Sequence, residues 1–218
     1  LAIDVYDNAM FIIALDYLLE MAPDSPQASR WKSLREGIER NVRAHLWDVK
    51  RQKFIPHIYP EKSPIPEGFD ELAIHYHGGT AIAIEAGLLS KDEIRTVNAQ
   101  MLENVRLSGM PSIGLTLYPV YPDGFFHGGM SKAYLYQNGG DWTWFGGRMI
   151  QQLVVNGMVE EAYAEIHPMI ERVIQNDGFY EWYGKGGVPS GSGNFKGSAG
   201  VLSKAIELLR DWAEKNKS

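Results

Sequence analysis

Seven segments of the chain have the residue periodicity of α-helices, and they alternate between two kinds. They span residues 5–21, 26–46, 70–87, 91–106, 140–157, 159–176 and 197–215. The second, fourth and sixth are amphipathic, whereas the first, third and fifth are apolar on nearly all sides. An amphipathic helix has one side in water, and a helix that is apolar all round is buried on most sides. The alternation predicts an all-α fold in which an outer ring of helices encloses an inner one.

The seventh segment continues the alternation as an inner helix. Its apolar positions are Val201, Leu202, Ala205, Ile206, Leu209 and Trp212. An odd number of helices cannot pair completely into inner and outer partners. We therefore expect an arc of a ring.

Composition narrows the classes of function. The 218 residues are 44% hydrophobic, enough for one domain with a substantial core. The net charge is −6 with acids and bases interspersed, so no basic stripe is available to bind a nucleic-acid backbone. No apolar run is long enough for a membrane helix, and there is no cysteine. The sequence predicts no nucleic-acid or membrane partner and chemistry by carboxylates, imidazoles or hydroxyls.

Three long connections each precede a segment expected to be an inner helix. They span residues 47–69, 107–140 and 176–198. Loops of this length in compact domains usually carry function. Because each of them precedes an inner helix, we expect the three loops to meet at one mouth of the ring.

Three motifs occur in a particular order. The chain opens with IDVYDNAMFIIALDYLLEM, continues to AYLYQNGGDWTWFGGRMIQQL, and ends with FYEWYGKGGVPSGSGNFKGSAGVLSKAI. This ordered set resembles the (α/α)6-barrel glycoside hydrolases related to glycogen-debranching glucosidases, trehalases and processing α-glucosidases. The chain departs from that family's pattern at Gln137, where His is usual, at Asp141 and at Lys196.

The resemblance has consequences for the architecture. A complete barrel of this family has twelve helices, and the motifs assign these seven to its C-terminal part. Residues 1–218 would then form a single partial catalytic domain without the N-terminal helices. The apolar flanks of Met10, Phe11 and Ile13 would be exposed, so we expect the missing N-terminal half or a partner chain to close the barrel.

The resemblance also implies a reaction. Family members invert the anomeric centre during hydrolysis, which needs two carboxyl groups on opposite sides of the scissile bond. Glu181 occupies the position of the general base, and the general acid would lie upstream of Leu1. The implied substrate is an α-glucoside or a similar small saccharide, with no cofactor. The competing interpretation of Glu181 is an exposed acid in a surface loop.

Several further residues would contact the sugar by the same resemblance. Aromatic faces suit the apolar side of a pyranose, which favours Trp142, Trp182 and Tyr183. Polar candidates for the sugar hydroxyls are Gln137, Asn138, Asp141 and Asp4. The alternative for these polar residues is helix capping, or compensation of the helix dipole in the case of Asp4 and Asp7.

Two other functions remain open on the sequence. His75, His77 and His127 would support a sugar epimerase or isomerase on the same barrel, with histidines as acid and base. The i, i+2 spacing of His75 and His77 is poor for chelation from a helix, so no metal site is predicted. The remaining alternative is a helical module that binds sugar through its aromatic loops without catalysis.

Overall fold

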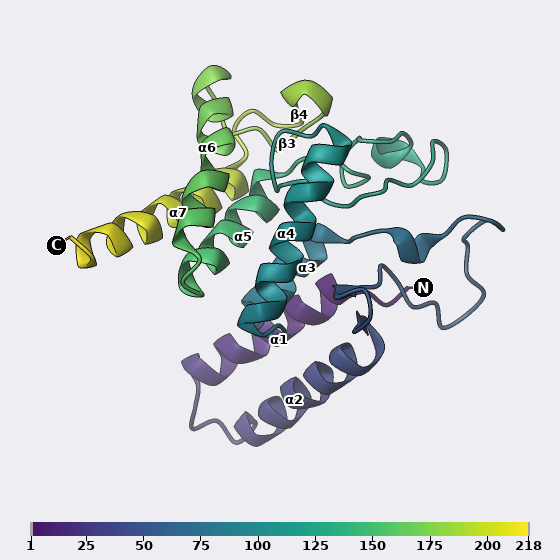
Figure 1. The fold of residues 1–218 in the computed structure, drawn as a ribbon. Helices are drawn as coiled ribbons and strands as arrows, with labels where there is room; N and C mark the ends of the chain where they lie inside the picture. The colour runs from purple at the N-terminus through teal and green to yellow at the C-terminus, as the bar shows by residue number, and fades with distance from the viewer. Residues whose placement is uncertain (1, 218) are drawn as a thin grey trace.

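The computed structural model describes residues 2–217, and seven α-helices occur in that range, as the sequence predicts. Figure 1 shows them: α1 (Val5–Met21), α2 (Ala28–His45), α3 (His77–Glu85), α4 (Lys91–Ser108), α5 (Thr143–Val155), α6 (Val159–Gln175) and α7 (Lys196–Lys215). The connections hold short antiparallel pairs and 3-10 turns: β1 (Trp47–Asp48) with β2 (Lys53–Phe54), β3 (Trp182–Tyr183) with β4 (Pro189–Ser190), η1 (Glu71–Ala73), η2 (Gly128–Met130) and η3 (Lys185–Gly187). None of the helices within residues 2–217 is long and apolar enough to cross a membrane.

Helix α4 shows how local sequence sets a boundary. The Ser90 side chain accepts a hydrogen bond from the Glu93 amide, and the Glu93 carboxylate accepts one from the Ser90 amide at 2.8 Å. This reciprocal pair satisfies two amides that have no partner inside the helix. Gly109 ends the helix in the left-handed region, at φ 69°. Both signals are readable in the sequence, and the predicted start is confirmed.

The third predicted segment was wrong over its first turns. Residues 70–87 were expected to form one helix, but Glu71–Ala73 is a 3-10 turn and α3 begins only at His77. The backbone of His75 instead exchanges two hydrogen bonds with Tyr118 of the next long loop, at 2.7 and 3.1 Å. The Lys53 ammonium also donates to the Ile74 carbonyl at 2.6 Å. These tertiary partners hold the segment extended, against its apolar helical pattern.

The helices form an arc of two layers. Helices α1, α3, α5 and α7 pack side by side in that order, while α2, α4 and α6 cover α1, α3 and α5. Every residue of α3 from His77 to Ile84 is buried, whereas Val42 is the buried residue of α2. The fold is therefore a partial (α/α) ring, and the predicted inner and outer helices are confirmed.

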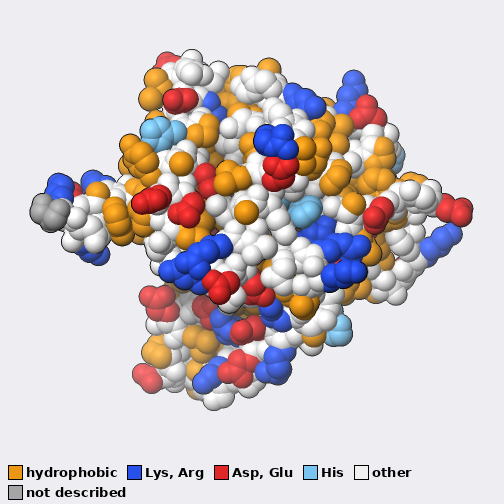
Figure 2. Space-filling view, viewed as in Figure 1, with side chains coloured by type: hydrophobic (Ala, Val, Ile, Leu, Met, Phe, Trp, Pro, Cys, Tyr) orange, Lys and Arg blue, Asp and Glu red, His pale blue; other side chains and the backbone are white. Residues whose placement is uncertain are grey.

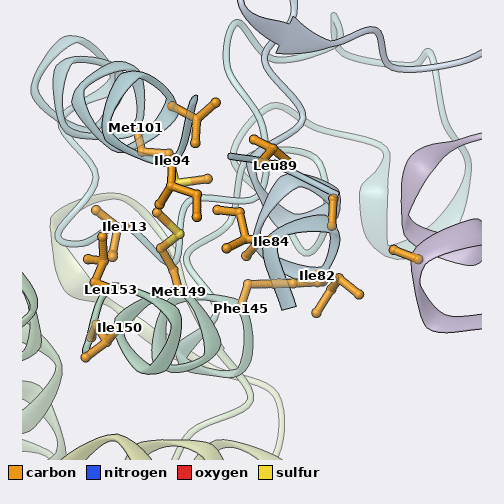
Figure 3. Packing of buried hydrophobic residues seen from close by; sticks show 14 of the residues in the cluster. Ile82, Ile84, Leu89, Ile94, Met101, Ile113, Phe145, Met149, Ile150 and Leu153 are labelled. Atoms are coloured by element: carbon orange, nitrogen blue, oxygen red, sulfur yellow. The ribbon is translucent and has the colours of Figure 1, made fainter. Parts of the chain in front are cut away.

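The core lies where an inner pair meets its covering helix. Figure 3 shows Ile84 of α3 facing Met149 of α5, with Ile94 and Met101 of α4 closing the same cluster, while Ile82 lies on the other side of α3. All five are at most 3% exposed. Burial of apolar side chains at this interface is the main stabilising contribution.

The two inner helices at the ends of the arc are less covered. On α1, Phe11 is 48% exposed and Met21 is 73% exposed, while Met10 and Ile13 are half-buried. On α7, Trp212 is 45% exposed. Acidic and basic side chains are interspersed over the face in Figure 2, without a single-sign patch. Each end helix has an inner neighbour on one side and an uncovered apolar flank on the other.

One buried acid makes stability depend on pH. Glu165 of α6 is 8% exposed, and its carboxylate accepts a hydrogen bond from the Asn98 amide of α4 at 2.8 Å. Burial raises the pKa of the Glu165 carboxyl from its ordinary 4.5 to about 7. Since the folded state holds this proton more tightly, its contribution is full below pH 4.5 and is lost as pH rises to about 7.

We expect Glu165→Gln to remove the loss of stability that occurs as pH rises to about 7. The neutral amide can still accept from Asn98, so the variant should gain up to roughly 3 kcal/mol in unfolding free energy at pH 8 and little at pH 4. Urea unfolding at both pH values measures the difference. Glu171→Gln, at an exposed position of the same helix, is the matched control. An equal pH slope in wild type and Glu165→Gln would contradict the assignment.

Candidate active site

The three long loops converge at the N-terminal ends of the inner helices α1, α3, α5 and α7. Backbone bridges join Ile3 to Ile58, His75 to Tyr118, and Asp141 to Tyr183, so each loop is paired with another loop or with the chain before α1. Figure 1 shows the first two of these loops side by side. The predicted common mouth is confirmed.

Glu181 lies at this mouth, half-buried, just before strand β3. Its amide donates to the Ser192 carbonyl at 2.9 Å, and the Ser192 amide lies 3.4 Å from Oε2 of its carboxylate. Gly191, at φ 72°, passes so close to this carboxylate that a Cβ there would collide with it. The turn that carries the acid therefore requires glycine for two reasons, backbone conformation and space.

Tyr136 lies near Glu181 and was not among the candidates from the sequence. Burial raises the pKa of its hydroxyl, and the nearby charge of Glu181 raises that pKa further. Its backbone has φ 49°, and its carbonyl accepts hydrogen bonds from the Gly140 amide at 3.0 Å and from the Trp142 indole at 3.1 Å. The sequence signal for it is its place at the head of the YQNGG motif.

The aromatic candidates divide between the mouth and the core. Trp142 is only 6% exposed and packs edge-on against Tyr136, with ring centroids 4.9 Å apart. Trp182 is half-buried and also meets Tyr136 edge-on, at 6.3 Å. Tyr183 is fully buried under the guanidinium of Arg172. Trp182 thus has surface to offer a ligand, Trp142 supports the Tyr136 ring, and Tyr183 is a core residue.

Asp141 and Asn138 are occupied by the protein itself. Both are fully buried. The Asp141 carboxylate receives the Ser112 hydroxyl at 2.7 and 2.9 Å and lies 2.8 Å from Arg172. Asn138 accepts from the Tyr121 amide at 2.9 Å and donates to the Tyr121 carbonyl at 3.1 Å. Their roles are structural, in place of the expected contacts with sugar hydroxyls.

The two remaining polar candidates are accessible. Gln137 is exposed, and its carbonyl accepts the Thr116 hydroxyl at 2.9 Å. Asp4 caps α1 by accepting the Asp7 amide at 2.9 Å, which is the structural role considered for it. Burial raises the pKa of the Asp4 carboxyl, partly offset by the hydrogen bond from Asp7.

His75 and His77 lie next to each other, with ring centroids 5.7 Å apart, on the side of α3 that α4 covers. His77 is 4% exposed, and its Nε2 lies 2.9 Å from the Asn104 amide on the covering helix α4. Burial lowers the pKa of His77 to about 3 and that of His75 to about 4, so both are neutral near pH 7. His75 lines a hollow on the same outer side, with Gln100 of α4. These two histidines therefore offer no support for the isomerase alternative.

A second polar cluster joins the first two long loops and was not anticipated. Glu71 Oε1 accepts hydrogen bonds from the hydroxyls of Tyr121 and Tyr59 at 2.5 and 2.7 Å, and His57 Nδ1 lies 2.8 Å away. Burial would raise the pKa of Glu71, but these three contacts together lower it. In residues 2–217, no group of three or more potential ligand side chains is arranged to hold a metal ion.

Comparison with known proteins bears on the fold. The sequence matches no protein-family model and no curated protein sequence. Solved structures do match. The GH63 mannosylglycerate hydrolase from Thermus thermophilus in complex with glucose has a TM-score of 0.64 at 17% identity, covering 96% of this chain and 48% of that one. The same hydrolase with Tris and D-glycerate has a TM-score of 0.63 at 18% identity, covering 96% and 46%.

A more distant structure, described as a sialidase, has a TM-score of 0.60 at 12% identity and covers 84% of this chain and 17% of that one. The present chain thus spans less than half the length of the mannosylglycerate hydrolase chains. Identities this low show a shared fold and no more. They agree with the partial helical ring described above.

Proposed function

We propose that this chain is the C-terminal part of the catalytic ring of an inverting glycoside hydrolase, with Glu181 as general base. The observation that carries the proposal is that Glu181, in the third long loop, lies near Tyr136 of the second long loop. The mannosylglycerate hydrolase with the same fold, which binds glucose in one structure, supports a saccharide substrate. We infer an α-glucosidic or similar small-saccharide linkage.

The proposed chemistry uses water as the nucleophile. Glu181 takes a proton from a water molecule that attacks the anomeric carbon, while an acid on the other face protonates the leaving oxygen. An inverting pair of carboxyl groups is spaced about 6.5–9.5 Å apart to admit this water. Trp182, half-buried next to Glu181, is the aromatic face that we assign to the sugar ring.

Proton NMR of the first-formed sugar tests the mechanism. α-Linked glucosides and mannosides should release the β-anomer before mutarotation, because inversion changes the configuration once. Release of the α-anomer would contradict a base role and favour a nucleophile. Saccharide binding without any hydrolysis by the protein with a complete ring would favour the sugar-binding module instead.

We further propose that additional helices, from the N-terminal half or a partner chain, complete the ring. An apolar groove of about 700 Å³ lies between α6 and α7, lined by Tyr163, Ile206, Trp212 and their neighbours. In Figure 2, hydrophobic side chains gather over these two helices at the left. The uncovered flank of α1 lies at the opposite end of the arc. Apolar surfaces of this kind normally contact another surface.

Trp212→Glu tests this closure. If additional helices cover the groove, the substitution should lower the unfolding free energy of the completed protein by about 3 kcal/mol. In the present chain alone, where Trp212 is 45% exposed, the effect should be much smaller. Ile174→Glu, at a 73% exposed position on α6, is the control. Equal losses for Trp212→Glu in both forms would contradict closure at this groove.

A further inference from the structure

Arg172 stands apart from the residues considered so far. It belongs to the covering helix α6 but is only 5% exposed, with its guanidinium 4.0 Å from the centre of the Tyr183 ring. Nη2 donates to the Thr143 hydroxyl at 2.6 Å, and Nη1 lies 2.8 Å from the Asp141 carboxylate. One side chain thus contacts the start of α5 and strand β3 together.

The Asp141 contact is mainly electrostatic. Nη1 of Arg172 is close to the carboxylate without the angle of a hydrogen bond, whereas the Ser112 hydroxyl supplies the directed bond. Buried ions of opposite charge depend on each other, because removal of either leaves an uncompensated charge in the interior. The pair therefore keeps the segment at Asp141 in one place between α5 and α6.

This segment is bonded to the strand that follows Glu181. The Asp141 amide donates to the Tyr183 carbonyl at 2.9 Å, and the Tyr183 amide donates to the Asp141 carbonyl at 2.8 Å. Tyr183 is two residues beyond Glu181 on the same hairpin. On the other side, the Ser198 hydroxyl of α7 holds the Tyr180 carbonyl at 3.1 Å. The backbone on either side of Glu181 is thus held by hydrogen bonds, at Tyr180 by Ser198 and at Tyr183 by Asp141. The second of these contacts depends on Arg172.

We propose that Arg172 is a positioning residue for Glu181, acting through Asp141 and Tyr183 from the outer layer of the ring. The proposal rests on the function assigned to Glu181. A base that must meet a water molecule and a sugar carbon in one geometry loses rate when displaced by about 1 Å, even by a change far from the chemistry. Saccharide contacts at Trp182 do not involve Arg172, so binding should be less affected.

The test compares Arg172→Lys with wild type in the protein that contains the complete ring. Lysine keeps the charge but loses the planar group that stacks on Tyr183 and reaches Thr143. We expect kcat to fall by about 10–100-fold with KM within about threefold. Hydrogen exchange at the Tyr183 amide should accelerate. Thr143→Val, which keeps both charges and the buried volume, should shift both readouts the same way by less.

Arg43→Lys is the matched control. Arg43 also pairs with a carboxylate, that of Glu93 at 2.7 Å, and also lies over an aromatic ring, that of Trp47 at 4.7 Å. Neither partner belongs to the loops 107–140 and 176–198. The substitution should change neither kcat nor the exchange at Tyr183.

Two outcomes would overturn the proposal. One is an unchanged kcat in Arg172→Lys despite faster exchange at Tyr183, which would limit Arg172 to stabilising the fold. The other is an equal loss of kcat in Arg43→Lys, which would indicate a general effect. Failure of the base assignment is visible separately, as absence of hydrolysis in wild type or full activity in Glu181→Gln.

Discussion

Glu181→Gln should lower the rate of glycoside hydrolysis by about a thousandfold while leaving saccharide affinity within about threefold. The amide keeps the size of the side chain, but it cannot take a proton from water. Activated aryl glucosides should lose as much rate as natural ones, because a good leaving group replaces the acid and cannot replace the base.

Steady-state rates and calorimetric affinities, both in the protein with a complete ring, measure the two quantities. Asp177→Asn is the matched control, since Asp177 lies exposed in the same loop at φ 47°, a conformation that Asn tolerates. The control should keep its rate within about twofold. A near-normal rate in Glu181→Gln would end the assignment of this residue as base.

Gly114→Ala should destabilise the protein by roughly 3 kcal/mol and disturb the mouth. A Cβ at position 114 would collide with the Asp141 carboxylate and lie 2.6 Å from the Trp142 carbonyl oxygen. The Trp142 amide also donates to the Gly114 carbonyl at 2.8 Å, so the two backbones cannot separate without losing that bond. Because the contact with Trp142 involves backbone atoms, no side-chain rotation relieves it.

Thermal and urea unfolding measure the loss of unfolding free energy. The control is Gly200→Ala, for which the same substitution should have the opposite effect. Gly200 lies inside α7, and a Cβ there would meet no atom within 4 Å. Alanine at such a helical position should stabilise the protein by about 0.5–1 kcal/mol. A neutral Gly114→Ala would show that the segments at residues 114 and 142 are held less closely than described.

The alternation of helix types was readable because it is a local pattern. The apolar faces of the segments alone predicted inner and outer layers and the open arc. The prediction of a helix over residues 70–87 was wrong over its first turns because the competing partner, the backbone of Tyr118, is more than 40 residues away. Local pattern carries no information about that partner.

The placement of the loops was predictable from the sequence, whereas the burial of their side chains was not. The order of loops and inner helices predicted that the loops come together, and the assignment of Glu181 as base stays a prediction. Asp141, Asn138 and Tyr183 were expected to face sugar but are buried. A polar or aromatic residue beside a helix start reads the same in sequence whether it faces a ligand or a buried partner such as Ser112 or Arg172. Whether such a residue is buried or exposed depends on which side chains from distant parts of the chain pack against it.

The sequence by itself determined the all-α class, the helix order and the loops that carry the site, because periodicity and capping act within one or two turns of chain. Only the tertiary structure decided which side chains in those loops remain available. Asp141 is buried next to Arg172, and Tyr136 lies near Glu181. These choices are made by pairings across tens of residues, where burial of a charge is tolerated only if its partner is present.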